Sequence, residues 1–123
     1  QETMQEHVGI YRDEAGMRAA LSKIEALKQR ARAVRADGPR EYNPGWHAAR
    51  DLHSMLTVAE VVTRAAIERT ETRGGHSRTD YPKTDPEWGK VNVVVRKIRG
   101  ALDLQRVPIA EMPAELKALL EAK

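Results

Sequence analysis

The sequence predicts a mainly α-helical fold: a three-helix bundle of the spectrin-repeat-like up-down type, followed by a C-terminal β-hairpin and a short terminal helix. Apolar residues recur at three- and four-residue steps over two long segments, which is the period of an amphipathic helix. A short connection that contains Gly and Pro separates the two segments, as in an antiparallel helical hairpin. After Pro86 the apolar period changes to two, which indicates strands. We therefore expect two units: a helical bundle over residues 1–82, which ends in an Arg-Gly-Gly-His loop, and a tail over residues 83–123.

The first two helices are predicted from the start of the chain. Residues 2–11 are a short mixed segment that is expected to form a helix of two or three turns. Asp13 is a favoured N-cap residue and is expected to begin a longer helix. The apolar stripe of that helix consists of Met17, Ala20, Leu21, Ile24, Leu27, Ala31 and Val34. The helix is expected to stop near Asp37-Gly38-Pro39, because Gly favours the C-terminal cap and Pro cannot continue a helix.

A third helix is predicted to run from about Pro44 to about Thr72 and to end at Gly74-Gly75. Asn43 is a good N-cap, and Pro fits the first helical position because its missing N–H has no partner there anyway. Its apolar stripe contains Leu52, Met55, Leu56, Ala59, Val62, Ala66 and Ile67, and it is widened by Val58, Val61 and Ala65. A stripe of this width implies packing on more than one neighbour.

The tail is expected to contain one β-hairpin and one short helix. Apolar residues alternate on both sides of Arg99-Gly100, which is a turn signal, so the hairpin is placed at about residues 91–107. Because an isolated two-stranded hairpin is marginally stable in water, we expect it to lie against another part of the molecule. Pro113 opens an amphipathic segment at about residues 113–122, with its leucines on one face.

Composition excludes several classes of function. The chain of 123 residues carries 21 basic and 18 acidic side chains, a net charge of +3. It contains no Cys, which excludes a disulfide framework, thiolate-bound zinc and a cysteine-held iron–sulfur cluster within this chain. The four His residues lack metal-ligand spacing, so no metal site is expected. The one local cluster of arginines, at residues 30–40, contains no aromatic side chain for stacking, so nucleic-acid binding is not expected.

Sequence signatures of catalysis and of membrane insertion are also missing. No uncharged apolar run is long enough to span a bilayer, so the chain is expected to be at most peripheral to a membrane through a partner. Neither Gly-rich phosphate-binding signature occurs, nor H-E-x-x-H, nor a nucleophile elbow. These absences leave the stretch from Arg73 to Arg78 as the candidate for a functional role.

The stretch from Arg73 to Arg78 has two interpretations. In the structural one, Gly74 or Gly75 takes the left-handed conformation that ends the preceding helix, and Arg73 lies at the negative end of the helix dipole. In the functional one, Arg73, His76 and Arg78 form a cationic loop that recognises a carboxylate. Spacing alone favours the structural interpretation.

A family resemblance changes that balance. "ETRGGHSRTDYP" is similar to the Glu-Ser-Arg-Gly-Ala-His-x-Arg-x-Asp-[Tyr/Phe]-Pro segment of succinate dehydrogenase and fumarate reductase flavoprotein subunits, with mild departures at Thr72 and Gly75. "ETMQEHVGIYRDEAGM" resembles the start of that family's C-terminal helical domain, and "EYNPGWHAARDLHSMLTVAEVVTRAAIERTETRGGH" resembles the long helix before the loop. The resemblance covers essentially the whole chain.

The resemblance implies that this chain is the C-terminal domain of a flavoprotein that interconverts succinate and fumarate. In that family the FAD-binding domain, with the flavin-linked histidine, the proton-transferring arginine and the main dicarboxylate-binding residues, precedes this region. The first residue, Gln1, fits a domain excised from such a parent. FAD is therefore expected in the parent and not in this chain, and the isolated fragment is expected to be inactive.

The resemblance also implies partners and a role for the loop. The expected partners are the FAD-binding domain of the same polypeptide, an iron–sulfur subunit that accepts the electrons, and membrane anchor subunits. The expected location is the cytoplasm, at the inner face of the membrane through those subunits. Arg73 and His76 match the arginine and histidine of the family motif and are expected to support the active site of the parent without transferring protons.

Two alternatives remain. L-aspartate oxidase shares the architecture and a similar Arg-Gly-x-His segment, although Arg78, the Asn43-Pro44-Gly45 helix start and the long tail favour the first family. A free-standing helical module for protein interaction is the other alternative, and it needs no preceding enzyme domain. Succinate oxidation and fumarate reduction are both compatible with the sequence.

Overall fold

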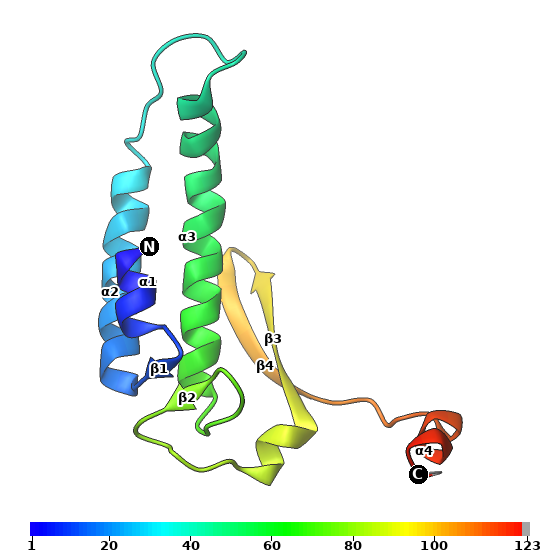
Figure 1. Cartoon of the computed structure of the whole chain (residues 1–123). Helices are drawn as coiled ribbons and strands as arrows, with labels where there is room; N and C mark the ends of the chain where they lie inside the picture. Colours follow the sequence, from blue (N-terminus) through cyan, green and yellow to red (C-terminus); the bar gives the residue numbers. More distant parts are fainter. Residues whose placement is uncertain (122–123) are drawn as a thin grey trace.

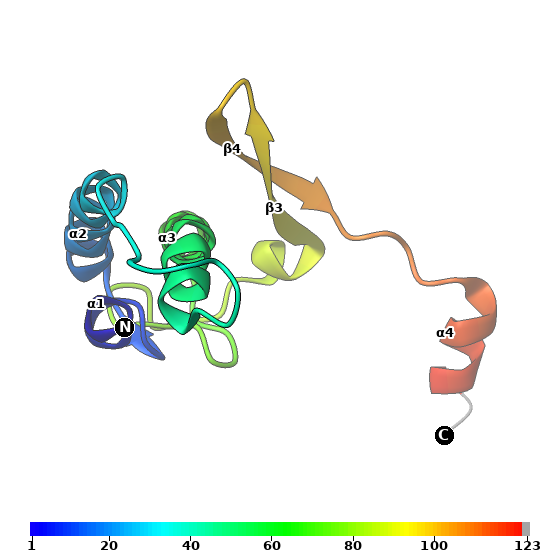
Figure 2. The same ribbon diagram turned by 90° about the horizontal axis from the view of Figure 1, so that it is seen from above.

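A computed structural model describes residues 1–121 and confirms the predicted fold class. Its elements are the helices α1 (Glu2–His7), α2 (Glu14–Ala31), α3 (Pro44–Glu68) and α4 (Ala114–Glu121), a 3₁₀ helix η1 (Pro86–Lys90), and the strands β1 (Tyr11–Arg12), β2 (Ser77–Arg78), β3 (Val91–Ile98) and β4 (Ala101–Pro108). The long helices α2 and α3 run side by side in opposite directions, and α1 lies against their lower part (Figure 1). Seen from above, the β3–β4 hairpin lies on the side of α3 away from α2, and α4 extends away from the bundle (Figure 2).

The predicted starts of both long helices are confirmed. The side chain of Asp13 accepts a hydrogen bond from the backbone N–H of Gly16 at 2.7 Å, and so caps α2. The side chain of Asn43 accepts from the N–H of Trp46 at 3.1 Å, and Pro44 occupies the first helical position of α3. Each cap satisfies a backbone donor that has no partner within its helix.

The helices end earlier than predicted. Helix α1 ends at His7 instead of residue 11, because the chain turns at Gly9, where an added Cβ would lie 2.7 Å from the carbonyl oxygen of Gln5. Helix α2 ends at Ala31 instead of near residues 37–39. The side chain of Val34, the last member of the predicted stripe, is 41% exposed, so the apolar contact that would hold another helical turn is missing.

Aliphatic side chains of different size form the core of the bundle. The main core cluster joins Val8, Met17, Ala20 and Ala66, with Met4 and Ile67 packed against it. Thr63 is fully buried, and its hydroxyl is satisfied by the carbonyl oxygen of Ala59 at 2.7 Å. This part of the core lies where α3 ends and α2 begins, and it therefore supports the loops at that end of the bundle.

The predicted hairpin and its turn are confirmed. Antiparallel pairing runs from Val91 opposite Pro108 to Ile98 opposite Ala101. Arg99 and Gly100 both have positive φ, 49° and 88°, which is the signature of a two-residue type I′ turn. The predicted terminal helix is present, although residue 122 lies outside the described residues. None of the described helices has the length and apolar character needed to cross a membrane.

Candidate functional site

The segment that follows α3 makes a tight turn beside the strands β1 and β2. The backbone N–H of Arg73 donates to the carbonyl of His76 at 2.9 Å, and the N–H of His76 donates back at 3.0 Å. Gly74, with a φ of 56°, lies at the tip of this turn next to Gly75. Since α3 has already ended at Glu68, the prediction that the two glycines terminate this helix is wrong. They close the turn that holds Arg73 and His76 together.

Arg78, not Arg73, caps the C-terminal end of α3. Its side chain is fully buried, and Nη1 donates to the carbonyl oxygens of Ala66 and Ile67, each at 3.1 Å. These carbonyls belong to the last turn, whose acceptors have no intrahelical partner. A guanidinium at this position also opposes the negative end of the helix dipole. The placement of Arg73 at that end, predicted from spacing, is therefore wrong.

Asp80 connects this cap to the beginning of α2. Its two carboxylate oxygens accept from Nε and Nη2 of Arg78 at 2.7 and 2.6 Å. Oδ2 also accepts from the backbone N–H of Glu14 in the first turn of α2, at 3.0 Å. These hydrogen bonds, above all the one from Arg78, lower the pKa of Asp80 to about 2. The pair ties the end of one long helix to the start of the other.

Glu71 is a buried carboxylate held between two guanidinium groups. Its Oε1 accepts from Nη2 of Arg69 at 2.6 Å and from Nε of Arg73 at 2.8 Å. Its Oε2 accepts from the backbone N–H of Asp85 at 2.8 Å. The hydrogen bond from Arg73 is the largest cause that lowers the pKa of Glu71 to about 2, and it outweighs burial, which acts in the opposite direction. Arg73 is further fixed by donating to the carbonyl of Asp85 at 3.0 Å.

Trp88 attaches the 3₁₀ helix to the same loop. The ring is 4% exposed, and its Nε1 donates to the hydroxyl of Thr70 at 3.2 Å. The guanidinium of Arg106, from β4, lies 4.2 Å from the ring centroid, and its Nε donates to Glu68 at 2.9 Å. The hairpin, η1 and the end of α3 therefore share one set of contacts.

His76 is held as a neutral hydrogen-bond donor. Its Nε2 lies 2.9 Å from the carbonyl oxygen of Arg69, and a carbonyl can only accept, so the proton is on Nε2. Burial is the main cause that lowers the pKa of His76, and the nearby charges of Arg12 and Arg78 act in the same direction. At neutral pH the ring is therefore uncharged, which suits positioning more than proton transfer.

A groove of about 610 Å³ lies beside these residues. Its lining consists of Arg12, Arg69, Arg73 and His76 together with Val62, Ala65, Ala66, Asn92 and Val93. It contains no acidic side chain, so an anion that enters it meets cationic groups and no carboxylate. Among the described residues, no group of three or more His, Asp or Glu side chains is placed to hold a metal ion.

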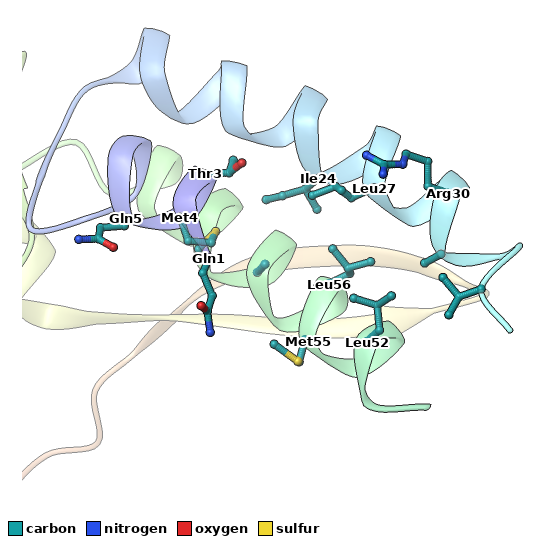
Figure 3. Close-up of a pocket in the computed structure, with 13 residues that line it drawn as sticks. Gln1, Thr3, Met4, Gln5, Ile24, Leu27, Arg30, Leu52, Met55 and Leu56 are labelled. Atoms are coloured by element: carbon teal, nitrogen blue, oxygen red, sulfur yellow. The ribbon is translucent and has the colours of Figure 1, made fainter. Parts of the chain in front are cut away.

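A larger cavity of about 790 Å³ lies between α1, α2 and α3 (Figure 3). Leu27 and Ile24 line it from α2, Leu52 and Met55 from α3, and Gln1 lies at its edge. This lining is mostly aliphatic, so the cavity is a packing groove and lacks the convergent polar groups of a catalytic site.

Comparison with known proteins identifies this architecture. The family described as fumarate reductase flavoprotein C-term matches residues 1–119. The chain belongs to this family. The domain is thus a flavoprotein C-terminal domain, as the motif around Arg73 predicts.

The relatives of this flavoprotein domain are much longer proteins. A fumarate reductase flavoprotein subunit of Haemophilus influenzae is 41% identical over 83 residues, which are 67% of this chain and 14% of that protein. An L-aspartate oxidase of Rhodospirillum rubrum is 39% identical over 84 residues, 68% of this chain and 24% of that protein. The solved structure "Mycobacterium smegmatis Sdh1 in complex with UQ1" superposes with a TM-score of 0.89 at 39% identity, over 98% of this chain and 21% of that chain. The chain therefore spans about a quarter or less of these relatives.

The structure brings the two predicted site residues of the flavoprotein domain, Arg73 and His76, onto one turn. Sequence reasoning did not single out Glu71, Arg69 or Arg12 as members of the site. Arg69 and Glu71 could have been found from their spacing. Together with Arg73 they occupy every second position, and in an extended segment such side chains project to one side. The position of Arg12 depends on the pairing of β1 with β2, which joins distant parts of the chain.

Proposed function

We propose that this domain is the C-terminal part of an FAD-dependent succinate dehydrogenase or fumarate reductase flavoprotein, which interconverts succinate and fumarate and passes electrons to an iron–sulfur subunit. Family membership over residues 1–119 supports this proposal, together with relatives named as fumarate reductase and succinate dehydrogenase flavoprotein subunits. In this arrangement the domain packs on the FAD-binding domain of the same polypeptide and supports the active site without performing chemistry alone.

The preceding domain is the place for FAD in this proposal. The described residues do not fit a flavin: the cavity of about 790 Å³ is mostly aliphatic, and the groove beside Arg73 offers no Gly-rich loop to hold a pyrophosphate. FAD supplies the redox chemistry when it is bound to the parent. The residues of this chain contribute position and charge at the boundary with that domain.

Arg73 and His76 are the residues proposed to support the active site. The observation that carries this role is the buried Glu71, which fixes Nε and Nη2 of Arg73 at 2.8 and 3.1 Å. Although it is held in this way, the Arg73 side chain remains 41% exposed, so part of its guanidinium faces outward. A cation that is already fixed can hold a carboxylate or carbonyl of the neighbouring domain without losing further conformational freedom.

The test is kinetic and uses the full-length flavoprotein. Arg73→Ala is expected to lower kcat/KM for succinate oxidation by roughly tenfold to a hundredfold, because small displacements of positioning groups have effects of that size. FAD content should stay normal, and the loss should appear in kcat more than in KM. Arg18→Ala, at an arginine whose side chain is 64% exposed on α2, is the matched control. Near-normal turnover in Arg73→Ala with FAD retained would show that Arg73 does not support the site.

The isolated chain should fold without catalysing the reaction. It has its own core but not the flavin site, so adding FAD and succinate should give neither a bound-flavin spectrum nor turnover. Clear flavin binding by the 123-residue chain would contradict this division of roles.

L-aspartate oxidation is the second candidate activity, since the Rhodospirillum rubrum relative carries that name. The two are separated by assaying the full-length protein with succinate and with L-aspartate. The first family predicts turnover of succinate or fumarate and none of L-aspartate. It also predicts co-purification with an iron–sulfur subunit and, through anchor subunits, association with the inner face of the membrane.

A start codon at the position of Gln1, with no preceding FAD-binding domain, would instead favour a free-standing interaction module.

A further inference from the structure

Arg12 differs from the arginines around it because its charge has no acidic partner among residues 1–121. Arg69 and Arg73 share Glu71, and Arg78 pairs with Asp80. Among the described residues, Arg12 makes no ion pair, and its one side-chain hydrogen bond runs from Nη2 to the carbonyl of Gly75 at 3.3 Å. Its Nε is buried and finds no hydrogen-bond partner in the described part of the chain. Arg12 as a whole is half-buried, so the cost of its position falls mainly on this unpartnered Nε.

The backbone holds Arg12 firmly in this position. The N–H of Thr79 donates to the carbonyl of Arg12 at 3.0 Å, and the N–H of Ser77 donates to the carbonyl of Ile10 at 3.0 Å. These bonds pair β1 with β2 in parallel register, with Arg12 opposite Arg78. Burial is the main cause that lowers the pKa of Arg12, and the charge of Arg78 contributes, so the surroundings disfavour the cation. Because the β1–β2 pair fixes the main chain, Arg12 cannot leave these surroundings without breaking backbone hydrogen bonds.

The surroundings of Arg12 match an anion that comes from outside the chain. Arg12 lines the groove with Arg69, Arg73 and the neutral His76, and no Asp or Glu is in that lining. Val62 on α3, which is 43% exposed, and Val93 on β3 supply apolar surface beside these cations in an open groove. A planar guanidinium recognises a carboxylate through two parallel hydrogen bonds.

We propose that this groove is a docking socket for an Asp or Glu side chain of the preceding FAD-binding domain, and that Arg12 is its ion-pair partner. This inference rests on the proposed function, because it requires that domain to precede Gln1. It adds a contact that fixes how the two domains sit together, separate from the support that Arg73 gives. The socket is formed by the β1–β2 pair, the end of α3 and the start of β3. The carboxylate of the FAD-binding domain occupies it.

A carbodiimide cross-link in the full-length flavoprotein tests the socket directly. This reagent joins a carboxylate to an amine as an amide with no spacer, so only groups in contact react. Arg12→Lys keeps the positive charge and supplies the amine. We expect a cross-link from position 12 to an Asp or Glu that precedes Gln1, identified by mass spectrometry of the peptides. Arg18→Lys is the matched control, and its introduced amine should couple to Glu14, the carboxylate that Arg18 pairs with at 2.6 Å.

The proposed contact would be rejected if Lys at position 12 couples only to Asp or Glu side chains of residues 1–123. It would also be rejected if this Lys couples to none while the control variant reacts. The outcome is independent of turnover. A cross-link in a protein that proves inactive on succinate and fumarate would keep the contact and reject the proposed activity. An active enzyme without the cross-link would reject the contact alone.

A second measurement needs no variant and applies if Arg12→Lys does not fold. Hydroxyphenylglyoxal modifies accessible arginines, and it can be applied to the unmodified flavoprotein and to the 123-residue chain alone. We expect Arg12 to react roughly tenfold more slowly in the full-length protein, as for a guanidinium engaged in a partly buried ion pair, and Arg18 to react at similar rates in both. Equal rates for Arg12 in the two proteins would overturn the proposal.

Discussion

Two fully buried charged side chains, Glu71 and Arg78, organise the loop that carries the candidate site. Neither charge is left alone: Glu71 accepts from Arg69, Arg73 and a backbone amide, and Arg78 is matched by Asp80 and by carbonyls of α3. Burying a charge is tolerated only when it is paired and hydrogen-bonded in this way. The loop therefore has one well-determined geometry, and its outward-facing groups are fixed as a consequence.

Removing the charge of Glu71 should destabilise the fold. Glu71→Gln keeps the shape of the side chain but leaves two arginines without their carboxylate, so we expect the free energy of unfolding to fall by on the order of 3 kcal/mol. Glu87→Gln is the matched control, since Glu87 is an exposed partner of Lys90 and should change stability by less than about 0.5 kcal/mol. Urea unfolding followed by circular dichroism measures both. Equal stability of the two variants would mean that the Glu71 network contributes little.

Acidification should also destabilise the fold, in two steps. Burial holds the pKa of His76 below its usual range, so the unfolded chain binds that proton first as pH falls, and stability is lost below about pH 6.5. The pKa values of Glu71 and Asp80, both lowered to about 2, make the unfolded chain the better proton acceptor at still lower pH, so more stability is lost below about pH 4.

Unfolding measured across pH, with His76→Gln, checks the first step. The amide N–H of Gln can still donate to the carbonyl of Arg69, but the side chain does not titrate, so the loss between about pH 7 and 5 should become smaller. His53→Gln, at an exposed residue of α3, should leave the profile unchanged. A His76→Gln profile identical to that of the unchanged chain would rule out His76 as the titrating group.

At the scale of elements, the turn between Arg73 and His76 depends on a left-handed backbone at Gly74. A φ of 56° is readily adopted by Gly but costs about 1 kcal/mol or more for an L-residue. Gly74→Ala should therefore lower stability by about 1 kcal/mol, although an added Cβ would meet nothing within 4 Å. Gly75→Ala is a close control: it has equally open surroundings, and its φ lies outside the left-handed region. Thermal unfolding of the two variants compares them, and equal midpoints would contradict a backbone origin.

Element starts were predictable from sequence, whereas most helix ends were not. The caps Asp13 and Asn43 bond to residues three positions away, so their signal is local. The end of α3 is decided by Arg78, which reaches the carbonyl of Ala66 from twelve positions further along the chain. The sequence favours the pair Gly74-Gly75 as the end of this helix. It cannot show that the guanidinium of Arg78 folds back onto the last carbonyls of α3, because that contact depends on the tertiary fold.

The candidate site divides in the same way. Arg73 and His76 could be named because they lie in one short motif that resembles the motif of a known family. The residues around them could not be predicted. Glu71 is held partly by the backbone amide of Asp85, fourteen positions away, and Arg12 is brought to the site by the pairing of β1 with β2. The β3–β4 hairpin was predicted well, because alternation and a two-residue turn at Arg99 and Gly100 are both local signals.

At the scale of the whole molecule, the contacts that hold the fold belong to the bundle, the loop and the hairpin. Trp88 joins the loop to the hairpin, since it is buried against the hairpin arginine Arg106 and bonded to Thr70, and Arg106 donates in turn to Glu68 at the end of α3. In contrast, α4 extends away from them (Figure 2), and its leucines Leu119 and Leu120 are 69% and 67% exposed.

Deleting α4 should therefore leave the isolated domain as stable as before, whereas truncating Trp88 should not. The chain shortened after Ile109 keeps the bond from the N–H of Ile109 to the carbonyl of Lys90, so its free energy of unfolding should change by less than about 0.5 kcal/mol. Trp88→Ala should lower it by about 3 kcal/mol, because a large side chain that is 4% exposed leaves a cavity at the junction. Urea unfolding of both variants makes the comparison. A shortened chain that loses as much stability as Trp88→Ala would mean that α4 packs on the domain in solution.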